Sequence, residues 1–427
     1  MSVKGLINNK IENIIAEIII EKSFKLRKIE IPKLIKVLCE LTNNSSPSYR
    51  DIALEYFIQF NEKISKVSFF NVLQNSIEGI LINILNSILF GKNTEKNLQQ
   101  NMFDRIIIQD STVLKLPDSA PSKFLGLVKG KGCKIQTYFD ILDNNFSEIE
   151  ITPFNVNEQK YSHEVKNVIK ANDLIIRDLG YFVVGAMHAI NEAKAFFLSK
   201  IHTNTKFYTE EGIELDLLEL LKTETNIDLR VLMTNQKLPV RIVASRLPEE
   251  VGNQRRQKKK EDRKSNPNKR SLAILDWNIL VTNIYDTSID MDTLINLYKL
   301  RWKIETIFKT WKSYCKITNF HERISGKQVI IYTLCRLINI LLLNQTIVKT
   351  IFNKSKLFKY TRVSYQSLMQ NLSKKFNQLI SATTSDELWS IVKKIIPYSL
   401  YEKRKKRTNM LELETITLSL MDSTMRL

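Results

Sequence analysis

Two short apolar runs, each closed by an aspartate, constrain the fold of this chain more than any other feature. Arg105–Asp110 and Asp173–Asp178 are too short for buried helices and fit buried strands. Helical patterns follow over Asn157–Ala171 and from Tyr181 to about Lys194, and Ala195–Lys200 is again strand-like. This alternation of strands and helices predicts an α/β fold, in which a mixed sheet is flanked by helices.

Further strand patterns are present on both sides of the second run. Lys134–Leu142 and Phe146–Thr152 alternate apolar and polar residues, and Asp143-Asn144-Asn145 between them predicts an antiparallel hairpin. The region 201–284 is predicted to be rich in strands. Its candidate strands are Lys206–Tyr208, Leu229–Met233, Val240–Leu247 and Ser271–Asn283.

Both ends of the chain are predicted to be helical. The candidate helices are Ile11–Lys22, Ile31–Thr42, 327–352, 362–373 and 385–397. A capping-box-like Ser48-Tyr-Arg-Asp51 opens one more helix, and a short turn separates it from a helix that begins at Ser65. This pair fits a DNA-reading helix-turn-helix or a plain packing hairpin equally well.

The net charge of +19 over 427 residues indicates a polyanionic partner, with nucleic acid favoured over an anionic membrane. Gln254–Arg270 holds nine Lys or Arg against two acids, and we interpret it as a phosphate-binding arm in preference to a solvated basic loop. Its candidate DNA contacts are Arg255, Arg256, Lys258, Lys259 and Lys260. No apolar run reaches the roughly 18–20 residues that span a bilayer. Four cysteines without a CxxC pair favour a reduced, cytoplasmic protein with no membrane contact.

A segment from Tyr298 to Lys312 has no Gly or Pro and is predicted to form one helix. At about 100° per residue, its polar face collects a phenol, an acid and three cations, opposite an apolar face. These residues are Tyr298, Arg301, Glu305, Lys309 and Lys312. Such a face is typical of a solvated salt-bridge stripe, but it also suits a site that handles metal and phosphate together.

Glu305 is a third candidate acid beside the two aspartates that close the apolar runs. Three carboxylates can hold two Mg²⁺ ions about 3.5–4 Å apart, which promotes attack and leaving-group departure in phosphoryl transfer. Hard oxygen ligands suit Mg²⁺. Asp110, Asp178 and Glu305 are therefore the predicted catalytic and metal-binding residues.

Tyr298, Arg301, Glu305 and Lys312 match the spacing Tyr-x2-Arg-x3-Glu-x6-Lys. In this signature, and in the blocks Asp110-Ser-Thr and Asp178-Leu-Gly-Tyr-Phe, the chain resembles the DDE transposases of bacterial insertion sequences. The resemblance covers roughly 100–320 and, loosely, 25–80. It implies an RNase H-like core with a strand-rich insertion between the second Asp and the Glu. It also implies cut-and-paste transposition, in which a nicked 3′-OH forms a hairpin that is reopened and joined to target DNA.

The resemblance also implies residue roles. Asp110, Asp178 and Glu305 would ligate two Mg²⁺ ions, for which Mn²⁺ can substitute. Tyr298, Arg301 and Lys312, with Lys309 as a weaker candidate, would contact DNA phosphates.

The tryptophans receive separate predictions. Trp277 stands where a strand tryptophan of similar enzymes stacks on a flipped base, although it also fits a place in the sheet core. Trp302 and Trp311 are predicted to be packing residues.

The implied domains are a helical DNA-binding domain (1–100), a catalytic core in two parts (101–200 and 285–325), a strand-rich insertion with a basic loop (201–284), and a helical C-terminal region for dimerisation (326–427). The implied partners are double-stranded DNA, as terminal inverted repeats and as target, and a second copy in a paired-end complex. The implied location is the bacterial cytoplasm, associated with the nucleoid. Two alternatives stay open: a domesticated DNA-binding regulator that has lost transposition, and an RNase H-like nuclease without strand transfer.

Overall fold

The computed structural model describes residues 29–43, 45–75, 77–90, 102–124, 130–235, 237–262, 266–321, 324–353, 363–382 and 384–401. The helix predicted over Ile11–Lys22 lies outside these residues. The chain divides into two compact units, each assembled from segments that are distant in sequence. The first unit consists of Met1–Asn97, Ser111–Val156 and Lys303–Arg407, and the second of Leu98–Asp110, Asn157–Trp302 and Thr408–Leu427.

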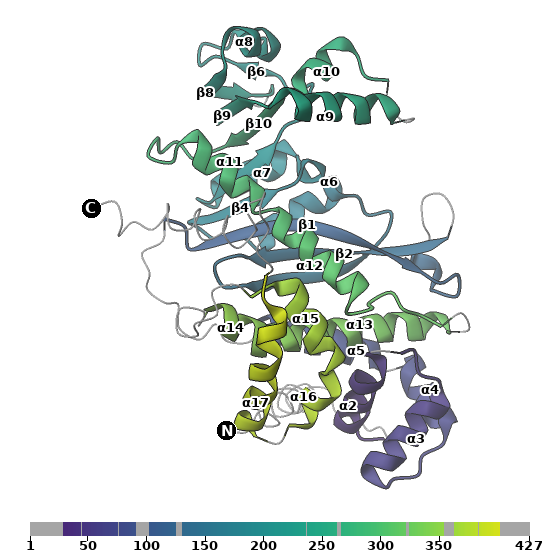
Figure 1. Ribbon diagram of the computed structural model, residues 1–427. Coiled ribbons are helices and arrows are strands. Elements are labelled where there is room, and N and C mark those ends of the chain that lie inside the picture. Colours follow the sequence, from purple (N-terminus) through teal and green to yellow (C-terminus); the bar gives the residue numbers. More distant parts are fainter. Residues whose placement is uncertain are drawn as a thin grey trace. The chain divides into compact units, whose positions relative to one another are not determined.

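The strands form one mixed sheet in the hydrogen-bonded order β3-β2-β1-β4-β5-β10-β9-β8-β6-β7. Several of them, among them β1, β2 and β4, are labelled in Figure 1. Strand β1 (Arg105–Leu116) belongs to both units, since its residues up to Asp110 lie in the second unit and the rest lie in the first. The predicted α/β class, with a mixed sheet flanked by helices, is confirmed.

Parallel pairing holds the core of the second unit together. The first half of β1 pairs in parallel with β4 (Asp173–Arg177), and β4 pairs in parallel with β5 (Phe196–Lys200). β10 (Trp277–Thr282) then runs antiparallel to β5. Ile107, Ile175 and their strand neighbours are fully buried, as expected for strands covered on both faces.

Short helices connect these strands. They are α6 (Glu158–Tyr161), the 3-10 turns η3 (Ser162–Asn167) and η4 (Leu179–Tyr181), and α7 (Val184–Glu192). The helix predicted over Asn157–Ala171 is therefore shorter than expected and ends in a 3-10 turn.

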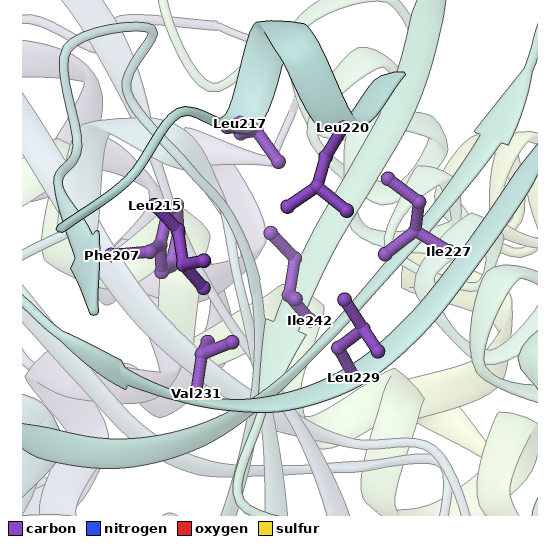
Figure 2. A pocket seen from close by; sticks show the side chains of 8 residues that line it. All are labelled: Phe207, Leu215, Leu217, Leu220, Ile227, Leu229, Val231 and Ile242. Carbon is purple, nitrogen blue, oxygen red and sulfur yellow. The ribbon is translucent and has the colours of Figure 1, made fainter. Parts of the chain in front are cut away.

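The strand-rich insertion is confirmed and extends the same sheet. Its strands are β6 (Phe207–Tyr208), β7 (Glu214–Leu215), β8 (Asn226–Met233) and β9 (Leu238–Arg246). Helix α8 (Leu217–Thr223) covers these strands, and Figure 2 shows the small apolar hollow between Leu217 and Leu220 of α8 and strand residues such as Ile242.

A buried arginine ties the insertion to the helix that follows it. Arg241 on β9 donates to Asp228 at 2.7 Å and to the carbonyl oxygens of Asp286 and Ile289 at 3.1 and 2.9 Å. Asp290 then caps α11 (Met291–Lys299) by accepting a hydrogen bond from the backbone of Thr293. The start of α11 is thereby fixed against the sheet.

Two predictions in the insertion are wrong in detail. The predicted basic loop is largely helical, forming α9 (Glu249–Glu261), with acids in its first turn and lysines in its last, which suits the helix dipole. The strand predicted over Ser271–Asn283 is shorter, because helix α10 (Lys269–Ile274) precedes β10.

The first unit is mainly helical. The hairpin of β2 (Lys131–Asp140) and β3 (Asn145–Pro153) is antiparallel, as predicted, and the 3-10 turn η2 (Ser122–Phe124) precedes it. The long helix α13 (Gly326–Leu343) is buried along nearly its whole length and packs on α2 (Ile31–Thr42) and α5 (Ile77–Phe90). Gly326–Phe352 is apolar and long enough to cross a membrane, but 89% of its most apolar window is buried inside the protein, as in a core helix.

The other helices of this unit match the predictions in part, since α16 was not predicted and α12 begins later than the predicted helix. They are α3 (Tyr49–Phe60), α4 (Lys66–Asn75), α12 (Trp302–Ser313), the π-helix η5 (Asn344–Val348), α14 (Lys349–Asn353), α15 (Tyr365–Lys374), α16 (Phe376–Ser381), α17 (Ser385–Ile395) and the 3-10 turn η6 (Ile396–Ser399). Ser48 and Asp51 form the expected capping box of α3. The use of α3 and α4 as a DNA-reading pair stays a prediction.

Candidate active site

The register of two parallel strands sets two acids side by side. Each residue of β1 from Arg105 to Gln109 pairs with a residue of β4, and Gln109 is opposite Arg177. Asp110 and Asp178 directly follow this residue pair, and neighbouring strands lie about 4.8 Å apart. Asp178 directly follows β4, as predicted, but Asp110 lies inside β1, which continues to Leu116. The prediction that both acids close their strands is therefore wrong for Asp110.

The residue pair directly before the two acids is buried and polar. The Arg177 Nε donates to Oε1 of Gln109 at 2.9 Å, and its Nη2 donates to the carbonyl oxygen of Ser162 at 3.2 Å. At the other end of the paired segment, Nε of Arg105 donates to Oδ1 of Asp173 at 2.9 Å. Both ends of the parallel pair are thus fixed by side chains from opposite strands, which resists a slip in register.

The segment predicted as one signature helix is two helices. α11 ends at Lys299 and α12 begins at Trp302, with Leu300 and Arg301 forming a turn between them. In this turn the amides of Leu300 and Arg301 donate to the carbonyls of Leu297 and Tyr298, three residues back. Tyr298 and Arg301 therefore belong to the end of α11 and the turn, whereas Glu305, Lys309 and Lys312 belong to α12.

Arg301 connects the turn to both aspartates. Its Nη1 donates to Oδ2 of Asp110 at 3.0 Å, and its Nε lies 3.6 Å from Oδ1 of Asp178. The Arg301 side chain is buried, and Asp178 is the more exposed of the two acids. The structure thus brings Asp110, Asp178 and Arg301 together within one unit.

Tyr298 is three residues before Arg301, near the end of α11. Its side chain is buried, and the Lys200 ammonium lies 5.5 Å from the centre of its ring. Burial raises the pKa of the Tyr298 hydroxyl, while the positive charge of Arg301 opposes that rise. The hydroxyl is therefore held neutral and can serve as a hydrogen-bond donor. Its predicted contact with DNA requires that the residues that bury it move.

Helix α12 carries the other signature residues. Glu305 is half-buried in its first turn, and Lys309 and Lys312 are exposed. Ile304, Ile307, Phe308 and Trp311 form the buried side, and the Trp311 ring lies 5.2 Å from that of Phe146 on β3. The predicted apolar face and the packing role of Trp311 are confirmed.

A buried lysine, which was not predicted, anchors the start of α12. Lys303 donates to Oδ1 of Asn144 in the β2–β3 turn at 2.7 Å, and its ammonium lies 5.6 Å from the Phe139 ring centre. The π-helix η5 holds the same turn, because Asn344 donates to the carbonyl of Asn144 at 3.1 Å. Asn144 has a positive φ of 49°, which asparagine tolerates well. These contacts fix the first turn of α12, and with it Glu305, inside the first unit.

The oxygen ligands of the cluster fit a hard divalent cation. Among the residues that the structure describes, no three Asp, Glu, His or Cys side chains are grouped so as to hold a metal ion. Asp110 and Asp178, however, direct carboxylate oxygens at the same guanidinium. Two carboxylates that face a shared space are a suitable partial ligand set for Mg²⁺.

The residues of the predicted basic arm divide into two groups. Arg255 donates to the carbonyl oxygen of Trp277 at 3.3 Å, and Arg256 forms an ion pair with Asp276. Lys258, Lys259 and Lys260 are exposed on α9. The arginines thus hold α9 against the start of β10, and the lysines form its exposed basic end.

Trp277 is placed as its sheet-core alternative predicts, whereas Trp302 is placed contrary to its packing prediction. Trp277, at the start of β10, is only 8% exposed. A DNA base can therefore reach its ring only if the residues that bury the ring move. Trp302, predicted to pack, is 56% exposed, and its ring centre is 5.7 Å from the guanidinium carbon of Arg301. The position of Trp302 next to a signature arginine was the available signal for a functional role.

One family model and three known proteins are similar to this chain. The family model described as a transposase DDE domain matches residues 101–340. The chain is 29% identical over 332 residues to the transposase for insertion sequence element IS1151 of Clostridium perfringens, which covers 70% of this chain and 69% of that protein. It is 27% identical over 349 residues to the transposase for element IS231B of Bacillus thuringiensis subsp. berliner, with coverage of 74% and 71%. Among solved structures, a piggyBac transposase synaptic complex with hairpin DNA aligns with 95% of this chain and 78% of its own, at 12% identity and a TM-score of 0.43.

Proposed function

The chain belongs to the transposase DDE domain family as a DNA transposase of the insertion-sequence type, and on that premise we propose that it cuts and joins the ends of an insertion sequence through a hairpin intermediate. It binds the terminal inverted repeats, frees a 3′-OH at each end and joins these ends to target DNA. The observation that carries the proposal is the pair of neighbouring carboxylates, Asp110 and Asp178, that face the Arg301 guanidinium.

Asp110 and Asp178, together with Glu305 of α12, are the proposed ligands of two Mg²⁺ ions, and Mn²⁺ can substitute for them. When bound, such ions lower the barrier to attack by water or a 3′-OH and stabilise the departing oxygen. The sheet supplies the rigidity that this chemistry requires, because the register of β1 and β4 fixes both aspartates.

Cationic side chains are proposed to hold the DNA backbone. Arg301, Lys309 and Lys312 have the charge needed to bind phosphates beside the scissile bond, with Tyr298 as a hydroxyl donor. The exposed end of α9, formed by Lys258, Lys259 and Lys260, is proposed to bind flanking phosphates. Because Arg255 and Arg256 contact their own chain, we assign them the positioning of α9 before any direct DNA contact.

A hairpin strains the DNA end and is relieved when a base leaves the stack. Trp277 was the predicted stacking partner, and Trp302 is the better placed one, since it is exposed beside Arg301. We therefore place the flipped base on Trp302, with Trp277 supporting the sheet next to α9.

Cleavage at both ends of an element favours two copies in a paired-end complex, and we propose a homodimer that uses the C-terminal helices. We place the protein in the bacterial cytoplasm, at the nucleoid.

One gel assay separates this function from the two alternatives. Labelled duplexes with the element's own ends are incubated with the protein, Mg²⁺ and a target plasmid. Strand-transfer products support a transposase, hairpin or nick products without transfer indicate a nuclease, and a shifted band without any cleavage indicates a DNA-binding regulator.

A further inference from the structure

One guanidinium is shared by two carboxylates at the centre of the site. Arg301 contacts Oδ2 of Asp110 at 3.0 Å and lies 3.6 Å from Oδ1 of Asp178. The side chains of Arg301 and Asp110 are largely buried, so solvent screens their contact little, whereas the Asp178 side chain is 41% exposed and is screened more. Two carboxylates on adjacent strands repel each other, and the positive charge of Arg301 offsets part of that repulsion.

The same space is where a divalent ion would bind. Mg²⁺ binds carboxylate oxygens at about 2.0–2.1 Å, and the guanidinium nitrogens already lie within 3.0 and 3.6 Å of one oxygen from each aspartate. A metal ion between Asp110 and Asp178 and the guanidinium in its present position would place positive charges in direct contact. The two cations therefore compete for the aspartates.

We propose that Arg301 is the resident counter-ion of the Asp110–Asp178 pair, that metal binding displaces its guanidinium, and that the displaced guanidinium then binds a DNA phosphate. This inference rests on the proposed function, which assigns the two aspartates to metal. By linkage, a phosphate that draws Arg301 away raises metal affinity, and bound metal raises the affinity for phosphate by the same factor. The guanidinium thus offsets part of the negative charge of the two aspartates until both DNA and metal are present.

The backbone around Arg301 is suited to such a movement. Arg301 lies in the turn between α11 and α12, outside both helices, so its side chain can reorient while the helices stay in place. The exposed Trp302 ring lies 5.7 Å from the guanidinium and offers it a cation–π contact. Trp302 is also a built-in reporter, because its fluorescence depends on the charge beside its ring.

The test is a titration with Mn²⁺ alone, without DNA, followed by electron paramagnetic resonance of the free ion. Arg301→Gln should bind Mn²⁺ about tenfold more tightly than the wild type, within the usual range of coupling between sites. Arg301→Lys keeps the charge but loses the fork that faces both acids, and should bind with intermediate affinity. The matched control is Lys299→Gln, which removes an equal charge from an exposed position two residues away and should change affinity less than twofold.

Equal or weaker Mn²⁺ binding by Arg301→Gln overturns the inference, as does equal tightening by Lys299→Gln, which would reveal a general charge effect. Absence of binding by both the wild type and Arg301→Gln overturns it too. If Arg301→Gln fails to fold, the comparison of Arg301→Lys with the wild type decides in the same way.

A second readout follows the guanidinium itself. Mg²⁺ should change the tryptophan fluorescence of the wild type, and the change should be lost in both Trp302→Phe and Arg301→Gln. A fluorescence change that persists in Trp302→Phe contradicts displacement of Arg301 next to that ring.

Asp110→Asn separates this inference from the proposed function. If Mn²⁺ binds equally well to Asp110→Asn and to the wild type, the metal lies elsewhere and the proposed site fails with the inference. If Asp110→Asn abolishes binding while Arg301→Gln has no effect, the proposed site stands and only the counter-ion role is refuted.

Discussion

Arg177 donates its Nε hydrogen to Oε1 of Gln109 at 2.9 Å, across the parallel strands and directly before the two aspartates that we propose as metal ligands. Both side chains are fully buried. The pair links fold to function, because the alignment of Gln109 with Arg177 is also the alignment of Asp110 with Asp178.

Gln109→Leu should lower the free energy of unfolding by about 1–3 kcal/mol, because it deprives a buried guanidinium of an acceptor. The change is measured by urea unfolding. The double variant Gln109→Leu/Arg177→Met should lose less free energy of unfolding than the sum of the two single variants. Each single variant leaves one buried polar side chain without its partner, whereas the double variant removes both polar side chains. Strictly additive costs would show that the two residues act independently. Gln136→Leu is a matched control, because Gln136 is also buried on a strand but its partner is a neutral hydroxyl 3.5 Å away.

Trp302→Ala should slow hairpin formation about tenfold while leaving the free energy of unfolding within about 0.5 kcal/mol of the wild type. Its ring is 56% exposed, so folding loses little when the ring is removed. The comparison is Trp277→Ala, which empties a buried position and should cost about 3–5 kcal/mol in stability. Hairpin yield on a gel and urea unfolding measure the two effects. Normal hairpin rates in Trp302→Ala would return the base-stacking role to Trp277.

Replacing Lys258, Lys259 and Lys260 by Gln should weaken DNA binding and make it less sensitive to salt. The slope of log affinity against log salt concentration should fall by about 0.9 for each DNA phosphate that the variant no longer neutralises. The measurement is a series of binding titrations at increasing NaCl. Arg256→Gln is the control, because Arg256 pairs with Asp276 and its loss should affect the docking of α9. An unchanged slope in the lysine variant would remove α9 from the DNA interface.

Acidification should destabilise the second unit through His202. Burial lowers the pKa of the His202 imidazole below its ordinary value of 6.5, and its ring packs edge-on against Phe182 at 5.3 Å. The unfolded chain therefore takes up a proton as the pH falls through about 6.5, while the folded chain resists it until its own lower pKa is reached. The free energy of unfolding is highest above about pH 6.5 and declines as the pH falls from there to the lower folded-state pKa. Below the folded-state pKa it is constant. Urea unfolding at pH 7.5 and 5.5 measures the decline, which should be smaller in His202→Gln; an identical decline would assign it to other groups.

The local features of the site could be predicted from the sequence. The run before Asp178 is short and apolar, and a run of this kind predicts the buried strand that the structure contains. The apolar face of α12 follows from its periodicity, so the burial of Trp311 was predictable. The helical state of α9 also had a signal, in the acids of its first turn and the lysines of its last.

What could not be predicted depends on partners far along the chain. Leu300 and Arg301 have good helix propensity, yet the signature helix breaks there, and Arg301 reaches Asp110, which is 191 residues away. The polar run after Asp110 resembles a strand end, but β1 continues through it because its second half has a neighbour in β2. Lys303 shows no local sign that its charge will be buried against Asn144.

The central proposal is that Glu305 acts with Asp110 and Asp178 in metal-dependent cleavage, and hairpin formation by Glu305→Gln tests it most directly. Glu219→Gln, an exposed helical glutamate on α8, is the control and should behave as the wild type. End-labelled duplex and Mg²⁺ are supplied, and cleavage and binding are scored on parallel denaturing and native gels. The prediction is that Glu305→Gln binds the duplex as well as the wild type and forms no hairpin. Hairpins at the wild-type rate from Glu305→Gln would contradict it.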